Sequence, residues 1–273
     1  MSTVISRLAV ALAGLPIVLG LAWIGGWPLV AAAAVVALLA LHELYRMTRA
    51  LRPLVLAGYG GAIAALVGLQ AGGIEWLGVG FALTVILAFV FAALADTSSS
   101  STAALSVTVF GVLWIVGGLA HLVLIRESAV DPGGAARGEL AIFTVLIAVF
   151  VIDTAAYVVG RLVGRRKLVP RLSPGKTWEG FVGGAVGGVF ATWVANYREG
   201  YLDSWEAIVL GLAIVLAATS GDLLESMIKR DVGVKDTGTL LAGHGGVLDR
   251  IDSLLLAGPV AFYVLLALDA VAP

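Results

Sequence analysis

Apolar runs, each of about 20 residues and so long enough to cross a bilayer as one helix, follow one another along almost the whole chain. Charged or Gly/Pro-rich breaks separate these runs. They lie near residues 8–24, 28–45, 54–71, 76–94, 105–125, 140–160, 180–197, 206–227 and 253–271. The pattern predicts an all-α, polytopic integral membrane protein with about nine transmembrane helices, in a single membrane domain over residues 1–273.

The composition supports a membrane location and limits the chemistry. Of the 273 residues, 60% are hydrophobic and 13% are charged, whereas soluble domains have about 25% charged residues. The chain has no cysteine and three scattered histidines, which excludes disulfides and metal sites built on thiolate or histidine. Any bound metal must therefore use carboxylate ligands. Because Arg7 precedes the first run, a cleaved signal peptide is an alternative interpretation, although no cleavage site of small residues precedes the second run.

The positions of Lys and Arg predict the orientation in the membrane. With the amino terminus inside, nine spans place 14 of the 17 Lys and Arg in the cytoplasm, where membrane proteins carry their excess of basic residues. Two densely charged loops, 161–176 and 229–250, then face the cytosol. We expect a multi-pass protein of the cell membrane with its amino terminus and these loops in the cytoplasm.

The two parts of the chain differ in polar content. Residues 1–139 have almost no polar residue in mid-span and are predicted to be scaffold helices, whereas residues 140–273 hold the expected catalytic helices and cytosolic loops. Asp153 lies in an apolar run, where a carboxylate costs about 2.5–3.5 kcal/mol on insertion scales. At helical spacing it shares a face with Tyr157 and Arg161. Both a structural ion pair and a ligand role are open for Asp153.

The basic loop before the seventh span ends in Gly175-Lys176-Thr177. This resembles the end of a P-loop, but Pro170 stands where the first glycine is required and no strand is predicted before it. We expect Lys176 and Thr177 to meet phosphate at a helix start, while a topogenic cluster near anionic lipid headgroups is the alternative. Small residues at every fourth position of the span, Gly180, Gly184 and Gly188, predict close helix packing.

The segment Ser226 to Asp252 contains twelve charged, hydroxyl or imidazole side chains. Before it, Asp222, Glu225 and Ser226 share one helix face, and at its end Asp249 and Asp252 open the last span. Carboxylates delivered to one membrane edge suit Mg²⁺, which takes a few carboxylates together with substrate phosphates. Glycines flank His244, and cations that suit a polyphosphate surround it, namely Lys229, Arg230, Lys235 and Arg250. The segment indicates a site for phosphate chemistry.

These residues resemble the signature of the phosphatidate cytidylyltransferase family, also called the CDP-diacylglycerol synthases. Ser226, a Lys-Arg pair, a Lys-Asp pair, His-Gly-Gly and a final Asp-Arg-x-Asp occur at the family's spacing. Ala242 departs from the pattern, where the family has Pro or Gly. A second block, from Asp153 to Gly180, is similar to another family segment.

The resemblance implies transfer of CMP from CTP to phosphatidate, which gives CDP-diacylglycerol and pyrophosphate for phospholipid biosynthesis. It implies that Asp222 and Asp249 hold Mg²⁺, with K⁺ left open as a companion ion, and that Lys176 is catalytic beside them. The residues implied in substrate binding are Tyr157, Arg161, Ser173, Lys176, Thr177, Lys229, Arg230, Lys235, His244 and Arg250. It also implies a homodimer within the membrane lipids, and no nucleic acid partner is expected.

Other classes of protein remain open from the sequence. An ion-coupled transporter could bury Asp153, Asp222 and Glu225 along an ion pathway, although it would not need a Gly-rich, charge-dense cytosolic loop. A CTP-dependent lipid kinase of the polyprenol type and a synthase that acts on an ether-linked lipid phosphate differ in their acceptor. A scaffold without activity would leave the carboxylate pairs unexplained.

Overall fold

The computed structural model describes residues 14, 16–94, 101–128, 135–197, 200–238 and 245–271, and most of them are helical. Among these residues, seven helices are long and apolar enough to cross a membrane. They are Gly26–Met47 (α2), Val55–Gly72 (α3), Ile74–Leu94 (α4), Ser101–Glu127, Arg137–Val163, Ser204–Asp231 (α9) and Leu248–Ala267 (α10). The prediction of an all-α, polytopic membrane protein is confirmed.

The number of nine spans stays a prediction. The first run, near 8–24, lies largely outside the described residues. The seventh run forms a helix, Trp178–Tyr197 (α8), which is not among the seven. Its five glycines contribute little to its mean hydropathy, which stays below that of the seven over a length that could span a membrane.

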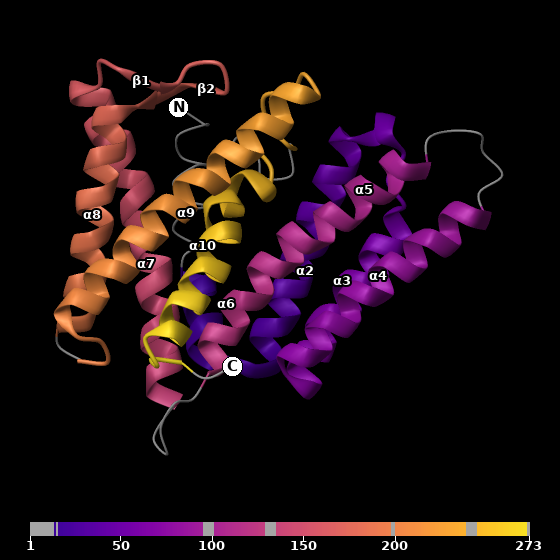
Figure 1. Cartoon of the computed structure of the whole chain (residues 1–273), viewed down its shortest axis with the longest axis horizontal. Helices are drawn as coiled ribbons and strands as arrows, with labels where there is room; N and C mark the ends of the chain where they lie inside the picture. The colour runs from indigo at the N-terminus through magenta and orange to yellow at the C-terminus, as the bar shows by residue number, and fades with distance from the viewer. Residues whose placement is uncertain are drawn as a thin grey trace. The chain divides into compact units, whose positions relative to one another are not determined.

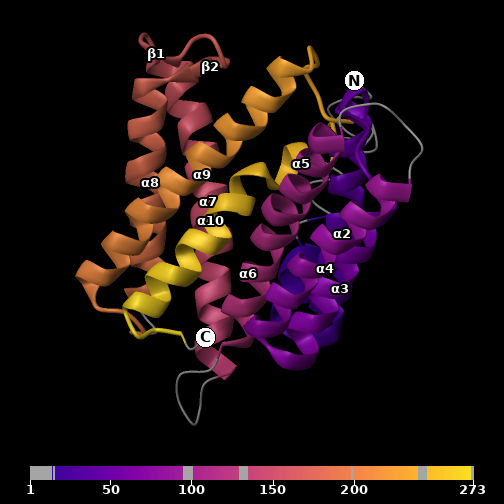
Figure 2. The same ribbon diagram turned by 45° about the vertical axis from the view of Figure 1, so that its right-hand side comes forward.

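The chain forms two compact units, Met1–Val123 with Asp231–Ile251 (unit 1) and Leu124–Arg230 with Asp252–Pro273 (unit 2). The positions of the two units relative to one another are not determined. Figures 1 and 2 show the same ribbon from two directions. The division of residues 1–273 into scaffold and catalytic parts stays a prediction.

Unit 1 packs α2, α3, α4 and α5 (Ser101–Gly111) side by side. After α2, a short 3-10 helix, Arg49–Leu51 (η1), leads to α3; after α5, a π-helical turn, Val112–Val116 (η2), leads into α6 (Gly117–Glu127). Gly73 separates α3 from α4 with a φ of +79° that glycine adopts without strain. Small residues let the paired helices approach: a Cβ on Gly61 would collide with the Thr84 side chain. The apolar side chains of this part therefore form a packed helical layer.

Unit 2 pairs α7 (Ala135–Val163) with α8 along most of their length. Gly180, Gly184 and Gly188 are buried. A Cβ on Gly180 would lie 2.7 Å from the Ala156 carbonyl oxygen, and one on Gly184 would lie 3.0 Å from that of Ile152. The prediction that this glycine stripe serves close helix packing is confirmed.

A two-stranded antiparallel hairpin, β1 (Lys167–Val169) and β2 (Ser173–Thr177), joins α7 to α8. Lys167 pairs with Thr177 and Val169 with Ser173. Both views show the hairpin at one end of the α7–α8 pair (Figures 1 and 2). The prediction that no strand precedes Pro170 is therefore wrong, because β1 ends at Val169. The three residues of β1 are too few to give an alternating pattern, and Pro170 lies in the turn between the strands, where its fixed φ is tolerated.

Candidate functional site

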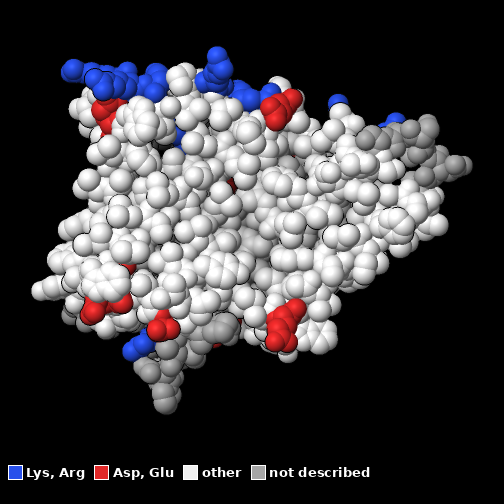
Figure 3. Space-filling model, viewed as in Figure 1, with Lys and Arg blue, Asp and Glu red and all other residues white. Residues whose placement is uncertain are grey.

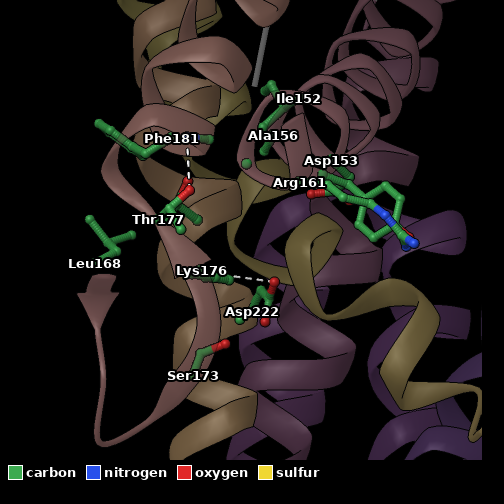
Figure 4. A pocket seen from close by; sticks show the side chains of 15 residues that line it. Ile152, Asp153, Ala156, Arg161, Leu168, Ser173, Lys176, Thr177, Phe181 and Asp222 are labelled. Carbon is green, nitrogen blue, oxygen red and sulfur yellow. Dashed lines mark hydrogen bonds and ion pairs between the residues drawn. The ribbon is translucent and has the colours of Figure 1, made fainter. Parts of the chain in front are cut away.

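A cavity of about 540 Å³ lies in unit 2 and is bounded by α7, the hairpin, α8 and α9 (Figure 4). Its size falls within the range of about 300–1,000 Å³ that is usual for small-molecule sites. Six of the residues that the sequence predicts for the site line it: Tyr157, Arg161, Ser173, Lys176, Thr177 and Asp222. The block that starts at Asp153 and the acidic end of α9 thus meet around one space.

Lys176 and Asp222 form an ion pair at this cavity, with 2.7 Å between Nζ and Oδ2. Figure 4 shows Lys176 reaching from β2 to the carboxylate on α9. The pairing of β2 with β1 fixes the backbone of Lys176. The side chains keep 22% and 33% of their surface exposed, so a charged ligand in the cavity can reach both groups.

Two further aspartates lie close to Asp222. Asp153 lines the cavity, hydrogen-bonds to Ser253, and interacts electrostatically with both Asp222 and Lys176. Asp252 interacts electrostatically with Asp222 and with Asp153. Gly221 makes this approach of α10 to α9 feasible, because a Cβ there would collide with the Asp252 carbonyl oxygen. Asp153 is therefore part of an acidic cluster that also includes a lysine.

The charges of this cluster do not balance. Glu225, which is 1% exposed, accepts a hydrogen bond from Lys229 at 2.5 Å and interacts with Asp252. Counted as fully ionised, the four carboxyl groups of Asp153, Asp222, Glu225 and Asp252 stand with the two ammonium groups of Lys176 and Lys229, a formal surplus of two negative charges. Like charges held together at low dielectric repel strongly. One divalent cation would neutralise the surplus.

The cluster offers only oxygen donors, and these suit Mg²⁺ better than softer metals. Within the described ranges, no three acidic or histidine side chains are arranged to enclose a metal by themselves. Mg²⁺ is commonly held by one or two carboxylates, with waters and substrate phosphates as its other ligands. The donors in unit 2 fit that mode of binding, in which the substrate completes the coordination.

Several predicted phosphate ligands already have protein partners. The Thr177 hydroxyl is buried and accepts a hydrogen bond from the Gly180 N–H at 3.1 Å, so it caps the start of α8. Arg161 donates to the Tyr157 hydroxyl at 2.7 Å. Arg230 donates from Nε to the Leu172 carbonyl at 3.3 Å, which ties α9 to the hairpin. Hydrogen bonds within the protein thus involve several side chains that were predicted from the sequence to bind substrate.

The hairpin end of unit 2 is basic. Figure 3 shows Lys and Arg gathered there, and acidic side chains at the end where α8 stops and α9 begins. The exposed basic residues of the hairpin region are Arg165, Arg166, Lys167 and Arg171. The Glu179 carboxylate accepts the backbone N–H of Arg165 at 3.0 Å and that of Arg166 at 3.2 Å. The hydrogen bond from Arg165, followed by that from its own backbone amide, lowers the pKa of Glu179 below its ordinary value.

Asp249 lies in unit 1, in the first turn of α10. Its Oδ2 accepts hydrogen bonds from Thr237 N at 3.1 Å, Thr237 Oγ1 at 3.0 Å and Gly246 N at 2.8 Å. Asp222 belongs to the other unit, so their convergence on one metal ion stays a prediction. Lys235 and Arg250 are exposed in unit 1, and His244 lies outside the described residues.

Three residues near these sites were not predicted. Thr219 lines the cavity, and Thr237 holds Asp249. Glu43, on α2, is 3% exposed and accepts hydrogen bonds from the backbone at the start of α10. An acidic residue in an apolar run was the signal that singled out Asp153, and the same signal would have found Glu43. A threonine within a helix or loop gives no comparable signal.

Comparisons with known proteins relate most of the chain to one family. A family model described as the cytidylyltransferase family matches residues 5–268. A phosphatidate cytidylyltransferase of Mycobacterium leprae is 44% identical over 128 residues, which are 47% of this chain and 41% of that protein. One of Haemophilus influenzae is 44% identical over 132 residues, 46% of each chain. The uncharacterized protein YnbB of Escherichia coli is 49% identical over 111 residues, 41% of this chain and 37% of that protein. The chain thus spans less than half the length of these relatives.

Proposed function

This chain belongs to the cytidylyltransferase family, and we propose that it transfers CMP from CTP to phosphatidate. The products are CDP-diacylglycerol, for phospholipid biosynthesis, and pyrophosphate. The Lys176–Asp222 pair carries the proposal, because it brings a cation from the block Asp153 to Gly180 and a carboxylate that precedes the Ser226 signature to one cavity. The names of the relatives from Mycobacterium leprae and Haemophilus influenzae agree with this activity.

The reaction joins two anions. A phosphate oxygen of phosphatidate attacks the α-phosphorus of CTP; the new P–O bond forms as the bond from the α-phosphorus to the α,β-bridging oxygen breaks. Pyrophosphate leaves with that electron pair. Because the attacking oxygen is already negatively charged at neutral pH, no general base is required. The main barrier is repulsion between the phosphates, so catalysis consists of positioning and of charge stabilisation.

The cavity residues divide this work. Lys176, at the wall of the cavity, exchanges its partner Asp222 for a phosphate oxygen. Arg161 and Ser173 orient the remaining phosphate oxygens from α7 and from β2. Outside the cavity lining, the expected substrate contacts are Lys229, Arg230, Lys235, His244 and Arg250. The cations raise the local concentration of both anionic substrates and fix their approach.

The proposed metal is Mg²⁺, held by Asp222 and Asp249, with K⁺ open as a companion ion. The surplus of two negative charges around Asp222 and the all-oxygen donor set support a divalent cation. When bound, Mg²⁺ neutralises charge on the reacting phosphates. The proposed site faces the cytosol, where the lipid headgroup arrives from the bilayer and the nucleotide from water. A homodimer and a cytoplasmic amino terminus belong to the same proposal.

The experiment that tests the activity uses purified protein in liposomes with Mg²⁺ and CTP labelled at either the α- or the γ-phosphate. We expect α-label in the lipid extract, and released pyrophosphate, only when phosphatidate is supplied. Parallel reactions contain a polyprenol or an ether-linked lipid phosphate as acceptor. A reaction without CTP measures the leak of ions from the liposomes.

The outcomes separate the competing functions. Transfer of γ-label to polyprenol would indicate a CTP-dependent kinase and contradict the proposal. Transfer of α-label to the ether-linked acceptor in strong preference to phosphatidate would contradict the proposed acceptor but would support CMP transfer from CTP. Ion flux without consumption of CTP would indicate a transporter and refute nucleotidyl transfer.

A further inference from the structure

Glu43 lies near the end of the apolar helix α2 and makes long-range hydrogen bonds. Its Oε1 accepts the Val247 N–H at 3.0 Å, and its Oε2 accepts the Leu248 N–H at 2.9 Å. The Thr237 hydroxyl lies 3.3 Å from the same Oε2. All of these residues belong to unit 1. One buried carboxylate therefore contacts both Thr237 and the start of α10.

Two glycines leave room for this carboxylate. A Cβ on Gly238 would lie 2.6 Å from Glu43 Oε1. A Cβ on Gly246 would collide with both Glu43 Oε2 and Thr237 Oγ1. Any other residue at these two positions would displace the carboxylate or the loop. The absence of side chains at Gly238 and Gly246 is thus a requirement of the contact with Glu43.

The donors explain how a carboxylate can be buried here. Leu248 begins α10, and the first amides of a helix lack partners within the helix. The positive end of the helix dipole also favours an anion at this place. Burial of a charge without hydrogen bonds would be very costly, and here two amides and a hydroxyl supply them. Glu43 therefore acts as an internal anion bound at the start of α10.

Thr237 connects Glu43 to Asp249. Its hydroxyl lies 3.0 Å from Asp249 Oδ2, and its N–H donates to the same oxygen at 3.1 Å. A hydroxyl has one proton, so it donates to one carboxylate at a time, while the N–H keeps Thr237 bonded to Asp249. A change at Glu43 is transmitted to Asp249 through this residue and through the backbone at the start of α10.

We propose that Glu43 is a positioning residue that fastens Thr237 and the start of α10 to α2 and so sets the orientation of Asp249. Glu43 does not touch the reacting groups. The hydrogen bonds and the glycine contacts by themselves support the role of Glu43 in holding the start of α10. Its effect on catalysis rests on the proposed function, in which Asp249 is a ligand of Mg²⁺.

The structural arm compares Glu43→Gln with Tyr45→Phe by hydrogen exchange of the full-length protein in liposomes, without metal or substrate. Gln replaces one acceptor oxygen with an NH₂ group, which cannot accept the N–H that faces it. We expect the amides of Val247 and Leu248 to exchange roughly tenfold faster or more. Tyr45 lies on the same helix as Glu43, and Tyr45→Phe removes its hydrogen bond to the Thr108 carbonyl on α5. This variant should leave the Val247 and Leu248 amides unchanged. Equal protection of Val247 and Leu248 in the wild type and Glu43→Gln would overturn the proposal.

The catalytic arm measures the Mg²⁺ concentration that gives half-maximal activity. Loss of a group that orients a metal ligand commonly weakens metal affinity about 10- to 100-fold. We expect a rise of at least roughly tenfold for Glu43→Gln and less than twofold for Tyr45→Phe. An unchanged Mg²⁺ requirement alongside faster exchange would refute the positioning of Asp249. A wild type that transfers no CMP would refute the proposed function but leave the exchange result intact.

A second variant decides the question if Glu43→Gln does not fold. Thr237→Val keeps the shape of the side chain and removes only the hydroxyl that joins the two carboxylates. It should increase exchange at Gly246, whose N–H donates to Asp249 at 2.8 Å, and should raise the Mg²⁺ requirement. Wild-type exchange and an unchanged Mg²⁺ requirement in Thr237→Val would contradict the connection between Glu43 and Asp249.

Discussion

The carboxylates of the two units are held in opposite ways. In unit 1, Glu43 is buried, accepts hydrogen bonds from two backbone amides and shares the Thr237 hydroxyl with Asp249. In unit 2, Asp222 faces two other aspartates and is paired with one lysine at a partly open cavity. The first arrangement satisfies its charge within the protein. The second keeps a surplus of charge, which a ligand can relieve. The partners of a carboxylate in a membrane protein, more than its burial, therefore indicate whether it has a structural or a chemical role.

Asp222→Asn tests this distinction with the largest expected effect. The variant loses a negative charge that the proposed metal and Lys176 both require, so we expect turnover to fall roughly 100-fold or more. In Asp222→Asn, the neutral side chain no longer repels Asp153 and Asp252, and this gain in stability offsets the loss of the ion pair with Lys176. The temperature of unfolding should therefore shift by no more than about 3 °C. Activity is measured as CTP-dependent labelling of lipid, and stability by thermal unfolding in the same detergent.

The control for Asp222→Asn is Asp269→Asn, which removes an exposed carboxylate just after the end of α10. Asp269 has a φ of 52°, a conformation that Asn tolerates. Both activity and unfolding temperature should match the wild type. A large drop in stability for Asp222→Asn, equal to its loss of activity, would place Asp222 in the structural class with Glu43.

Asp249 combines features of a structural carboxylate, held by hydrogen bonds, and of a carboxylate that binds a ligand. Its Oδ2 accepts three hydrogen bonds from Thr237 and Gly246, yet the proposal makes it a metal ligand. Asp249→Asn should abolish turnover and also destabilise the fold, by about 1–3 kcal/mol, if the NH₂ group faces these donors. Asp222→Asn should lower turnover without destabilising the fold. Normal turnover of Asp249→Asn would refute its role as a metal ligand.

Lys176→Ala has the next largest expected effect, on substrate use. Loss of the cation from the cavity wall should lower kcat/KM roughly tenfold or more, which corresponds to about 1.4 kcal/mol of transition-state stabilisation. Lys167→Ala is the matched control, since Lys167 is an exposed lysine on the partner strand, paired with Thr177. It should keep kcat/KM within about twofold of the wild type. Equal losses in both variants would favour a general attraction of the hairpin to anionic lipids.

The sequence predicted the features that depend on local composition. Apolar runs of sufficient length gave the membrane helices, and glycines at every fourth position gave the packing of α8 on α7. The polar face of Asp153, Tyr157 and Arg161 was predicted from helical spacing, and all three residues line the cavity. These features follow from hydrophobicity and from a fixed helical period, so they can be obtained without tertiary contacts.

Features that depend on contacts between distant segments were not predicted. The hairpin was missed because its strands are short and it is held partly by Glu179 and Arg230, which lie outside it. The cap role of Thr177 and the ion pair of Lys229 with Glu225 compete with the phosphate contacts assigned to them. Glu43 stands in an apolar run and could have been found from that signal, but its hydrogen-bond donors lie about 200 residues farther along the chain. No local pattern identifies such a partner.

Glu179 should show the smallest effect. Like Glu43, it accepts hydrogen bonds from two backbone N–H groups, but its carboxylate is not buried. Its carboxylate accepts two backbone amides, and its pKa lies below the ordinary value of 4.5, first because Arg165 donates to it. A carboxyl group whose pKa is lower in the folded state stabilises the fold above its unfolded pKa. That stabilisation is lost as the pH falls through the folded pKa. Solvent reaches Glu179, so the effect on stability should be small.

Thermal unfolding of Glu179→Gln and the wild type between pH 7 and pH 3 measures this contribution. Other carboxyl groups titrate equally in both proteins, so the difference between the two unfolding temperatures reports Glu179 alone. The variant should unfold at a slightly lower temperature than the wild type above pH 4.5, and the difference should vanish at lower pH, where the wild-type carboxyl group is protonated. A difference as large as that of Glu43→Gln would show that the type of donor outweighs burial. A difference that does not shrink as the pH falls from 7 to 3 would mean that the charge of Glu179 does not hold the hairpin.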